Sequence, residues 1–425
     1  MPFTHVRTVA GIDEYRHDEN GLTVLLLQDR AAPVATFMIT YHVGSRNEGP
    51  GTTGATHLLE HLMFKGTERH HKRAGASIFN VLQRVGAQIN ATTWLDRTNY
   101  YELLPREHLE QAIVIEADRM RGALIDPDDL ASERTVVLNE FDRGDNDPLR
   151  KLYQNVWSAA FVAHPYHHPT IGWRSDIEHV SRDALKAFYD TYYWPNNATA
   201  SVIGDFETED ALALIDEYFG AIPASPHEIP AMNTREPEQR GERRITLRQP
   251  GELGAVMHAY KMPDGLHPDT DALDVLARIL ASGKNSRFYR ELTDKGLTTY
   301  AYASAGRHRD PGLFAAYCTL TPDTTHETLE AGMNAAVDTL KRDGVTEAEL
   351  RRAQAKVRAM EAFGRDGPYA VAAQLNEAIA AGDWTLYATY LDRIERVTVD
   401  DVNRVANDYL VEHQRTVGHY IPISD

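Results

Sequence analysis

The stretch Gly54-Ala-Thr-His57-Leu-Leu-Glu60-His61-Leu-Met-Phe64 organises the rest of the chain. Its two histidines are four residues apart, a spacing that stacks two side chains on one face of a helix. Both imidazoles can then reach one ion from the same side. Glu60 falls on that side as well, where a carboxylate can hold a water molecule and take its proton. The apolar residues of the stretch can bury the rest of the helix, and Gly54 suits a helix entry.

This pattern, H-x-x-E-H, is the inverted form of the common zinc-peptidase motif. With 19 histidines and 62 acidic residues in the chain, about 0.1 matches to H-x-x-(D/E)-H are expected by chance. On its own, the motif leaves open a surface helix with two unrelated histidines. A catalytic zinc site needs three protein ligands and one open position, so the third ligand decides between the two interpretations.

A second helical stretch offers that ligand: Asp129-Leu-Ala-Ser-Glu133-Arg-Thr-Val-Val-Leu-Asn-Glu140-Phe-Asp. Glu133 and Glu140 are seven residues apart, which is two helical turns, so they share a face. One acid could bind the metal while the other orients a ligand. The alternative is a solvated acidic face, and the spacing alone does not choose between them.

Together with three further segments, these stretches resemble the insulysin, pitrilysin and mitochondrial processing peptidase family, in the form of the zinc-bearing subunit of the short bacterial type. The further segments are Phe64-Lys-Gly-Thr, Gly86-Ala-Gln-Ile-Asn90-Ala-Thr-Thr and Asp96-Arg-Thr-Asn-Tyr100-Tyr101. The resemblance extends over nearly the whole chain and is strongest in the first half. It implies a bound zinc ion, and because the ligand motif is absent from the second half of the chain, one zinc ion per chain is expected.

The resemblance also implies a role for each residue of the two helical stretches. His57, His61 and Glu140 would be the zinc ligands. Glu60 would be the general base, and Glu133 would be a catalytic-site acid that acts from behind the ligands. The implied activity is that of a zinc metalloendopeptidase, which hydrolyses extended peptides or unfolded segments in a closed chamber.

Substrate contacts follow from the same resemblance. An extended peptide would pair with an exposed strand edge at residues 88–92, which makes Asn90 and Ala91 candidates for substrate binding. Asn90 is equally typical of a turn. The second half of the family's enzymes supplies an arginine and a tyrosine to the active site. In the matching stretch here, Leu292-Thr-Asp-Lys-Gly-Leu-Thr-Thr-Tyr300, the tyrosine is present as Tyr300, but Thr293 stands in place of the arginine.

The missing arginine leads to a prediction about partners. We expect a heterodimer with a related subunit that supplies an arginine and tyrosine pair, since threonine cannot offer a charged donor to a developing oxyanion. A homodimer, with Tyr300 acting alone or with Arg290, is the alternative. A non-catalytic scaffold subunit or a peptide-binding module of the same fold is the rival function, although such relatives are expected to lose ligands or the base.

Composition argues against several classes of partner and gives an expectation for the compartment. A net charge of −18 argues against nucleic acid and against an anionic membrane surface as partners. The single cysteine, Cys318, cannot form an intrachain disulfide. No apolar run of about 18 residues is present, so no membrane span is expected. The N-terminus lacks a signal-peptide pattern; the prediction is a cytoplasmic protein, or a periplasmic one if a signal peptide was removed.

An internal repeat indicates how the 425 residues are organised. Residues 177–192 match residues 394–409 at an offset of 217 without a gap, which favours a duplication over chance similarity between two amphipathic helices. At this offset the ligand motif falls on Asp274, Ala277 and Arg278, so the second copy carries no ligand set.

The predicted fold class is α+β, with two tandem homologous domains. The family resemblance implies that each is a mixed, mainly antiparallel β-sheet covered by helices. The predicted boundaries are a zinc-bearing domain at 1–225, a linker at 226–243 that is rich in proline and charged residues, and a homologous domain without a metal site at 244–425.

Overall fold

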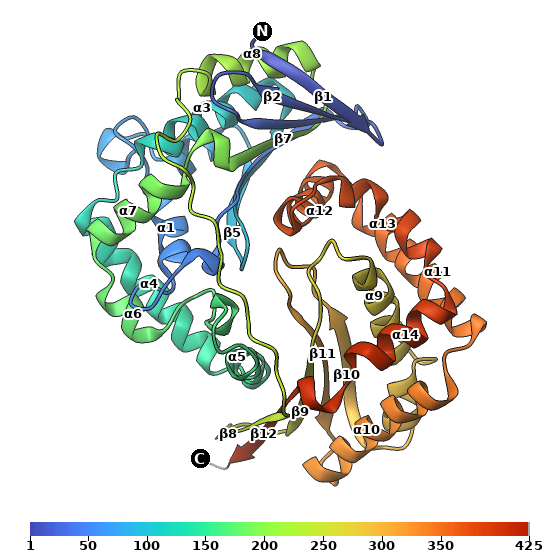
Figure 1. The fold of residues 1–425 in the computed structure, drawn as a ribbon. Helices are drawn as coiled ribbons and strands as arrows, with labels where there is room; N and C mark the ends of the chain where they lie inside the picture. The colour runs from blue at the N-terminus through green and yellow to red at the C-terminus, as the bar shows by residue number, and fades with distance from the viewer. Residues whose placement is uncertain (424–425) are drawn as a thin grey trace. The chain divides into compact units, whose positions relative to one another are not determined.

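The protein is described by a computed structural model that covers residues 1–423. Contacts divide the chain into two compact units. Unit 1 consists of Met1–Phe141, His168–Asn233 and Gly364–Ala388. Unit 2 consists of Asp142–His167, Thr234–Phe363 and the segment from Thr389 onward. Each unit contains one β-sheet with helices packed against it (Figure 1).

Unit 1 is built on a seven-stranded sheet in the order β1-β2-β3-β7-β4-β6-β5. Neighbouring strands are antiparallel except β3 and β7, which are parallel. The strands are β1 (Phe3–Val9), β2 (Ile12–His17), β3 (Thr23–Gln28), β4 (Val34–Tyr41), β5 (Gln88–Thr93), β6 (Thr98–Pro105) and β7 (Ala198–Gly204).

Both faces of this sheet are covered, and the strand sequences show why. In β3, Val24 and Leu26 belong to one hydrophobic cluster, whereas Leu25 belongs to another on the opposite face. A strand that is apolar on both faces needs a helix layer on each side. The helices of unit 1 are α1 (Ala55–Met63), α2 (Ile78–Arg84), α3 (Leu109–Gly122), α4 (Pro127–Asp145, whose last residues enter unit 2), α6 (Arg174–His179), α7 (Arg182–Tyr192), α8 (Thr208–Phe219) and α12 (Pro368–Ala381).

Unit 2 repeats the design with a five-stranded sheet in the order β10-β11-β9-β12-β8. Here β8 and β12 are the parallel pair and the other neighbours are antiparallel. The strands are β8 (Arg243–Pro250), β9 (Ala255–Lys261), β10 (Thr298–Ala305), β11 (Leu313–Leu320) and β12 (Arg415–Ile423). The helices are α5 (Pro148–Ala160), α9 (Pro268–Ala281), α10 (His326–Asp343), α11 (Glu347–Gly364), α13 (Thr385–Arg396, which begins in unit 1) and α14 (Val399–Tyr409).

The predicted fold class is confirmed, and the two sheets correspond strand by strand. The order β3-β7-β4-β6-β5 in unit 1 has the same directions as β8-β12-β9-β11-β10 in unit 2. Helices α7 and α14 lie 217 residues apart at both ends. Each is capped by the side chain of the residue that precedes it, Ser181 or Thr398, which accepts a hydrogen bond from a backbone N–H of the first turn.

Two helices belong to the unit that is built mainly from the other half of the sequence: α5, from the first half, packs in unit 2, and α12, from the second half, packs in unit 1. Helix α5 packs on β12, β8 and β9, and α12 packs on β4, β7 and β6. Gly418 in β12 permits the first contact, because a Cβ there would lie 2.4 Å from a methyl carbon of Val156 and 2.9 Å from one of Leu152. The compact units therefore depart from the sequence-based division at residues 142–167 and 364–388. The predicted boundaries at 225 and 244 stay a prediction.

Candidate metal centre

Helix α1 carries the H-x-x-E-H motif, and its apolar residues fix the orientation of the helix. Leu58, Leu59, Leu62 and Met63 are buried in the core of unit 1. The helix begins after Gly54, which has a left-handed backbone with φ of 84°. A Cβ at this position would also lie 2.4 Å from a backbone oxygen. Both the conformation and the close approach therefore require glycine at the helix entry.

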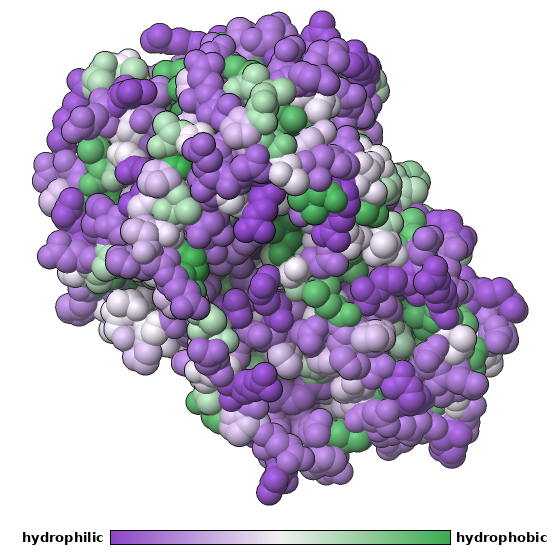
Figure 2. Space-filling view, turned by 45° about the horizontal axis from the view of Figure 1, so that its top comes forward, coloured by the Kyte–Doolittle hydropathy of each residue, from purple (hydrophilic) through white to green (hydrophobic). Residues whose placement is uncertain are grey.

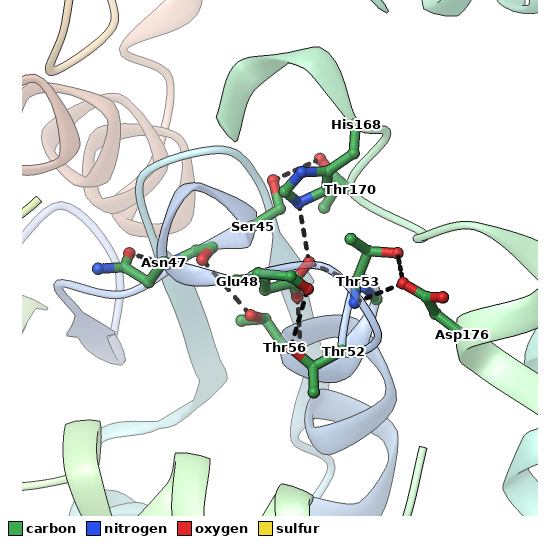
Figure 3. A network of polar contacts seen from close by, with 12 residues as sticks. Ser45, Asn47, Glu48, Thr52, Thr53, Thr56, His168, Thr170 and Asp176 are labelled. Atoms are coloured by element: carbon green, nitrogen blue, oxygen red, sulfur yellow. Dashed lines mark hydrogen bonds and ion pairs between the residues drawn. The ribbon is translucent and has the colours of Figure 1, made fainter. Parts of the chain in front are cut away.

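Because Gly54 has no side chain to cap the helix, a buried carboxylate supplied by the preceding loop takes that role. Glu48 accepts hydrogen bonds from the N–H groups of Gly54 at 2.8 Å and Thr56 at 2.7 Å. Nε2 of His168 lies 3.1 Å from the same carboxylate. Figure 3 shows Glu48 between His168 and the first turn of α1. A negative charge at a helix N-terminus is favourable, so Glu48 also complements the helix dipole.

Three side chains from α1 and α4 converge on one point. The ligand atoms of His57, His61 and Glu140 lie within 4.8 Å of one another, the only such group within residues 1–423. Oε2 of Glu140 is 3.8 Å from Nε2 of His57 and 3.7 Å from Nε2 of His61. Two donors on a tetrahedral zinc ion are separated by about 3.4 Å, given zinc–nitrogen and zinc–oxygen bonds of about 2.1 Å. The donor types and their spacing therefore fit zinc, while the assignment of the three residues as ligands stays a prediction.

Glu133 is not one of the three converging residues but contacts one of them, His61. Its Oε2 is 2.9 Å from Nδ1 of His61, and its Oε1 is 2.5 Å from Nζ of Lys65. A carboxylate on Nδ1 favours the tautomer in which Nε2 carries the lone pair for a metal. Sequence reasoning placed Glu133 in this role through the family resemblance, but it missed Lys65.

Glu60 is largely buried, and its carboxylate is held by Thr93 on β5. The Thr93 hydroxyl donates to Oε2 at 2.6 Å. Burial raises the pKa of Glu60, and the hydrogen bond from Thr93 partly offsets this effect. Thr93 was not among the predicted site residues. Thr93 is the last residue of the segment Gly86 to Thr93 that resembles the family, so its polar side chain in that segment was the one sequence signal that could have pointed to it.

The proposed ligands, Glu60 and Glu133 all line one cleft of about 620 Å³. Asn90, the predicted substrate contact, lines the same cleft. It belongs to β5, which is the last strand of its sheet and therefore has one edge without a neighbouring strand in that sheet. Ala91 is mostly buried in β5. The cleft is lined by His57, Glu60, His61, Phe64, Lys65, His71, Lys72, Ser77, Phe79, Asn90, Asp129, Ser132, Glu133 and Glu140.

Tyr300 belongs to unit 2, whereas the residues around α1 belong to unit 1. It lies on β10, an edge strand, with 51% of its surface exposed and its ring centre 5.8 Å from that of Tyr317. Thr293 ends a π-helical turn. The nearby Arg290, the suggested substitute for the missing arginine, pairs with Glu349 at 3.1 Å.

Two consecutive parts of the chain match known protein families. Residues 23–173 match the family described as Insulinase (Peptidase family M16), and residues 179–357 match the Peptidase M16 inactive domain. The zinc protease PqqE of Helicobacter pylori is 31% identical over 403 residues, which cover 94% of this chain and 90% of that protein. The chain belongs to the insulinase family of peptidases, M16. The predicted family is thereby confirmed.

Two further relatives extend the comparison. The crystal structure of a protease from Helicobacter pylori superimposes with a TM-score of 0.90 at 29% identity and covers 99% of both chains. The probable mitochondrial-processing peptidase subunit beta of Arabidopsis thaliana is 24% identical, over 96% of this chain and 78% of that protein. One of these relatives is thus described as a protease and the other as a peptidase subunit.

Hydrophilic residues cover most of the face seen in Figure 2, and hydrophobic residues appear there in small groups. Within residues 1–423, no helix has the length and apolar character needed to cross a bilayer.

Proposed function

We propose that this M16 protein is a zinc metalloendopeptidase, with His57, His61 and Glu140 as the ligands of one zinc ion per chain and Glu60 as the general base. The observation that carries the proposal is the convergence of the two histidines, Glu140 and Glu60 in one cleft beside the edge strand β5. The relatives named as zinc proteases support the choice of metal.

A bound zinc ion supplies Lewis acidity, which polarises a peptide carbonyl and makes a water molecule a stronger nucleophile. The chain's own residues do the rest. Glu60 accepts the proton of the attacking water and passes it to the leaving amine. Thr93 holds Oε2 of Glu60, which leaves Oε1 for the proton transfer. Glu133 keeps the ring of His61 in the required orientation.

The substrate class proposed is an extended peptide or an unfolded segment. The free edge of β5 can pair with the backbone of such a peptide, a mode of binding that tolerates many sequences. Asn90 and Ala91 lie on this strand, and Asn90 also lines the metal cleft. Enclosure of the substrate in a chamber is part of the proposal, because the family resemblance implies it.

The rival function is a non-catalytic subunit that binds peptides or acts as a scaffold. The observation in its favour is the match of residues 179–357 to an inactive domain. An unlabelled extended peptide, incubated with the zinc-loaded chain and followed by mass spectrometry, separates the two functions. Cleavage that a chelator stops and zinc restores supports the peptidase. Binding without cleavage, both by the chain alone and in the presence of the proposed partner subunit, supports the scaffold.

For partners, we propose a heterodimer with a related subunit that supplies an arginine and tyrosine pair. Thr293 in place of the arginine, the pairing of Arg290 with Glu349 and the relative named subunit beta support this. The homodimer is the alternative. Activity of the purified chain alone, measured together with its mass in solution, distinguishes them: full activity as a homodimer, unaffected by Tyr300→Phe, would rule out the heterodimer.

A further inference from the structure

Unit 2 contains a second cleft, of about 330 Å³, between helices α9 and α11. We call it the α9–α11 cleft. Its wall includes Arg278 near the end of α9, the loop at residues 282–286, and Arg352 and Lys356 of α11. The complete lining is Arg278, Ile279, Ser282, Gly283, Lys284, Asn285, Ser286, Glu349, Arg352, Ala353 and Lys356.

This cleft is the counterpart, within the duplicated architecture, of the metal cleft in unit 1. At the offset of 217, α1 falls within α9 and most of α4 falls on α11. His61 corresponds to Arg278, which lines the second cleft as His61 lines the first. The two copies therefore share their backbone frame and differ in the side chains that face the cavity.

The two clefts differ in the balance of charge: four acids and two lysines line the metal cleft, whereas four cations and one acid line the α9–α11 cleft. Four acids line the metal cleft of unit 1, and all four correspond to uncharged residues in unit 2. Glu60, Asp129, Glu133 and Glu140 correspond to Ala277, Thr346, Leu350 and Val357. In their place, the α9–α11 cleft presents the cations Arg278, Lys284, Arg352 and Lys356. A site lined by acids suits a metal ion, whereas one lined by cations suits an anion.

Two details leave this positive charge available to a ligand. The acid in the lining, Glu349, is already neutralised by Arg287 at 2.6 Å and Arg290 at 3.1 Å. Arg278 pairs with Asp274 through one terminal nitrogen at 3.3 Å, but its buried Nε has no hydrogen-bond acceptor among residues 1–423. A buried N–H without an acceptor is costly, and an oxyanion in the cleft would satisfy it.

We propose that the α9–α11 cleft binds a small phosphate-bearing oxyanion with at least two phosphoryl groups. Four cations around one cavity call for a ligand with several negative charges, and arginine pairs with phosphate in a bidentate manner. The net charge of −18 disfavours general attraction of anions, so binding must come from this local cluster. The proposal does not depend on peptidase activity.

Titration calorimetry of the full chain with inorganic tripolyphosphate tests the proposal. The expected result is saturable binding of one equivalent per chain. Arg352→Gln with Lys356→Gln should weaken it by at least about tenfold, because two charge-assisted contacts are lost. The matched control is Arg351→Gln with Arg358→Gln, which removes the same charge from the same helix at positions outside the lining. The control should bind as the unchanged chain does.

Tripolyphosphate also binds zinc, so the titration is repeated with His57→Ala plus His61→Ala. Binding that survives this change and is lost in the cleft variant supports the proposal. Three results would overturn it: the absence of saturable binding, equal weakening in the cleft variant and the matched control, or loss of binding with the two histidines.

Discussion

The hydroxyl of Thr93 donates a hydrogen bond of 2.6 Å to Oε2 of Glu60. This contact joins the edge strand β5 to the helix that carries the metal motif. Thr93 itself is tied into a network, because the neighbouring Thr92 is held by Arg97, which in turn pairs with Glu377 on α12. The orientation of the proposed base therefore depends on the sheet edge proposed to bind the peptide.

Thr93→Val removes this hydrogen bond with little change in side-chain volume. We expect kcat to fall by about tenfold, as for loss of a hydrogen bond to a charged group, with KM and zinc content unchanged. Thr93→Ser keeps the hydroxyl and should retain most of the activity. Equal activity of the valine and wild-type proteins would show that Thr93 does not position Glu60, whereas a wild-type chain that stays inactive in the presence of the proposed partner subunit would refute the proposed function instead.

Glu60→Gln removes the proposed base and leaves the proposed ligands in place. We expect peptide hydrolysis to fall by about 10²-fold or more, while the protein still binds zinc and keeps its circular dichroism spectrum. Activity and metal content are measured on the same preparation. Near-normal turnover by the metal-loaded variant would mean that another group takes the proton.

Zinc content tests the ligand assignment independently of activity. Elemental analysis of metal-replete protein should give one zinc per chain, since one ligand group is present within residues 1–423. His57→Ala with His61→Ala should abolish binding. Glu133→Gln should weaken zinc affinity by about 10- to 100-fold, because Glu133 orients His61 rather than binding metal. A stoichiometry of two, or retention of zinc by the double variant, would refute the assignment.

The sequence predicted the fold class and the metal group because both have local signals. The spacing of His57, Glu60 and His61 fixes their common face once α1 forms, and the repeat at 217 residues was visible in α7 and α14. The convergence of Glu140 on the two histidines is a tertiary contact, so spacing alone left two acids as candidates. The family resemblance, rather than physical reasoning, selected Glu140.

Other features could not be predicted because they depend on long-range packing. Glu48 caps α1 from six residues before Gly54, and it does so through a loop held by His168, which is 120 residues away in the chain. His168 follows a short helical turn at Pro165–His167 in which Tyr166 is buried. The contact between His168 and Glu48 has no signal in the sequence.

A buried histidine in unit 2 predicts a pH dependence of stability. Burial, assisted by the nearby positive charge of Arg415, lowers the pKa of His258 to about 3. Glu330, Arg244 and His419 also face it. An unfolded histidine has a pKa of about 6.5. The folded state therefore resists protonation, so this contribution to stability is complete above pH about 6.5 and declines as the pH falls toward 3.

The comparison of His258→Phe with the unchanged chain isolates this contribution. Between pH 7 and pH 5, the free energy of unfolding of the wild-type chain should decrease by about 2 kcal/mol more than that of the variant. Denaturant titrations at the two pH values measure both changes, and any packing cost of phenylalanine cancels in the difference. His227→Phe, at an exposed histidine, is the control for the substitution. Equal pH dependence of wild type and His258→Phe would contradict the assignment.

The cap on α1 gives the last prediction. Glu48 receives two backbone N–H groups and the His168 ring in a fully buried setting. Glu48→Gln replaces one acceptor oxygen by a donor, so at least one of these three groups loses its partner. We expect the free energy of unfolding to decrease by about 1–3 kcal/mol, the cost of a buried unsatisfied polar group. Zinc affinity should also decrease, because Thr56 directly precedes His57 and its N–H helps to fix the first turn of α1.

The control is Glu68→Gln, at an exposed acid, which should change the free energy of unfolding by less than about 0.5 kcal/mol. A Glu48→Gln protein as stable as Glu68→Gln, with unchanged zinc affinity, would mean that the loop and not its carboxylate holds the metal helix in place.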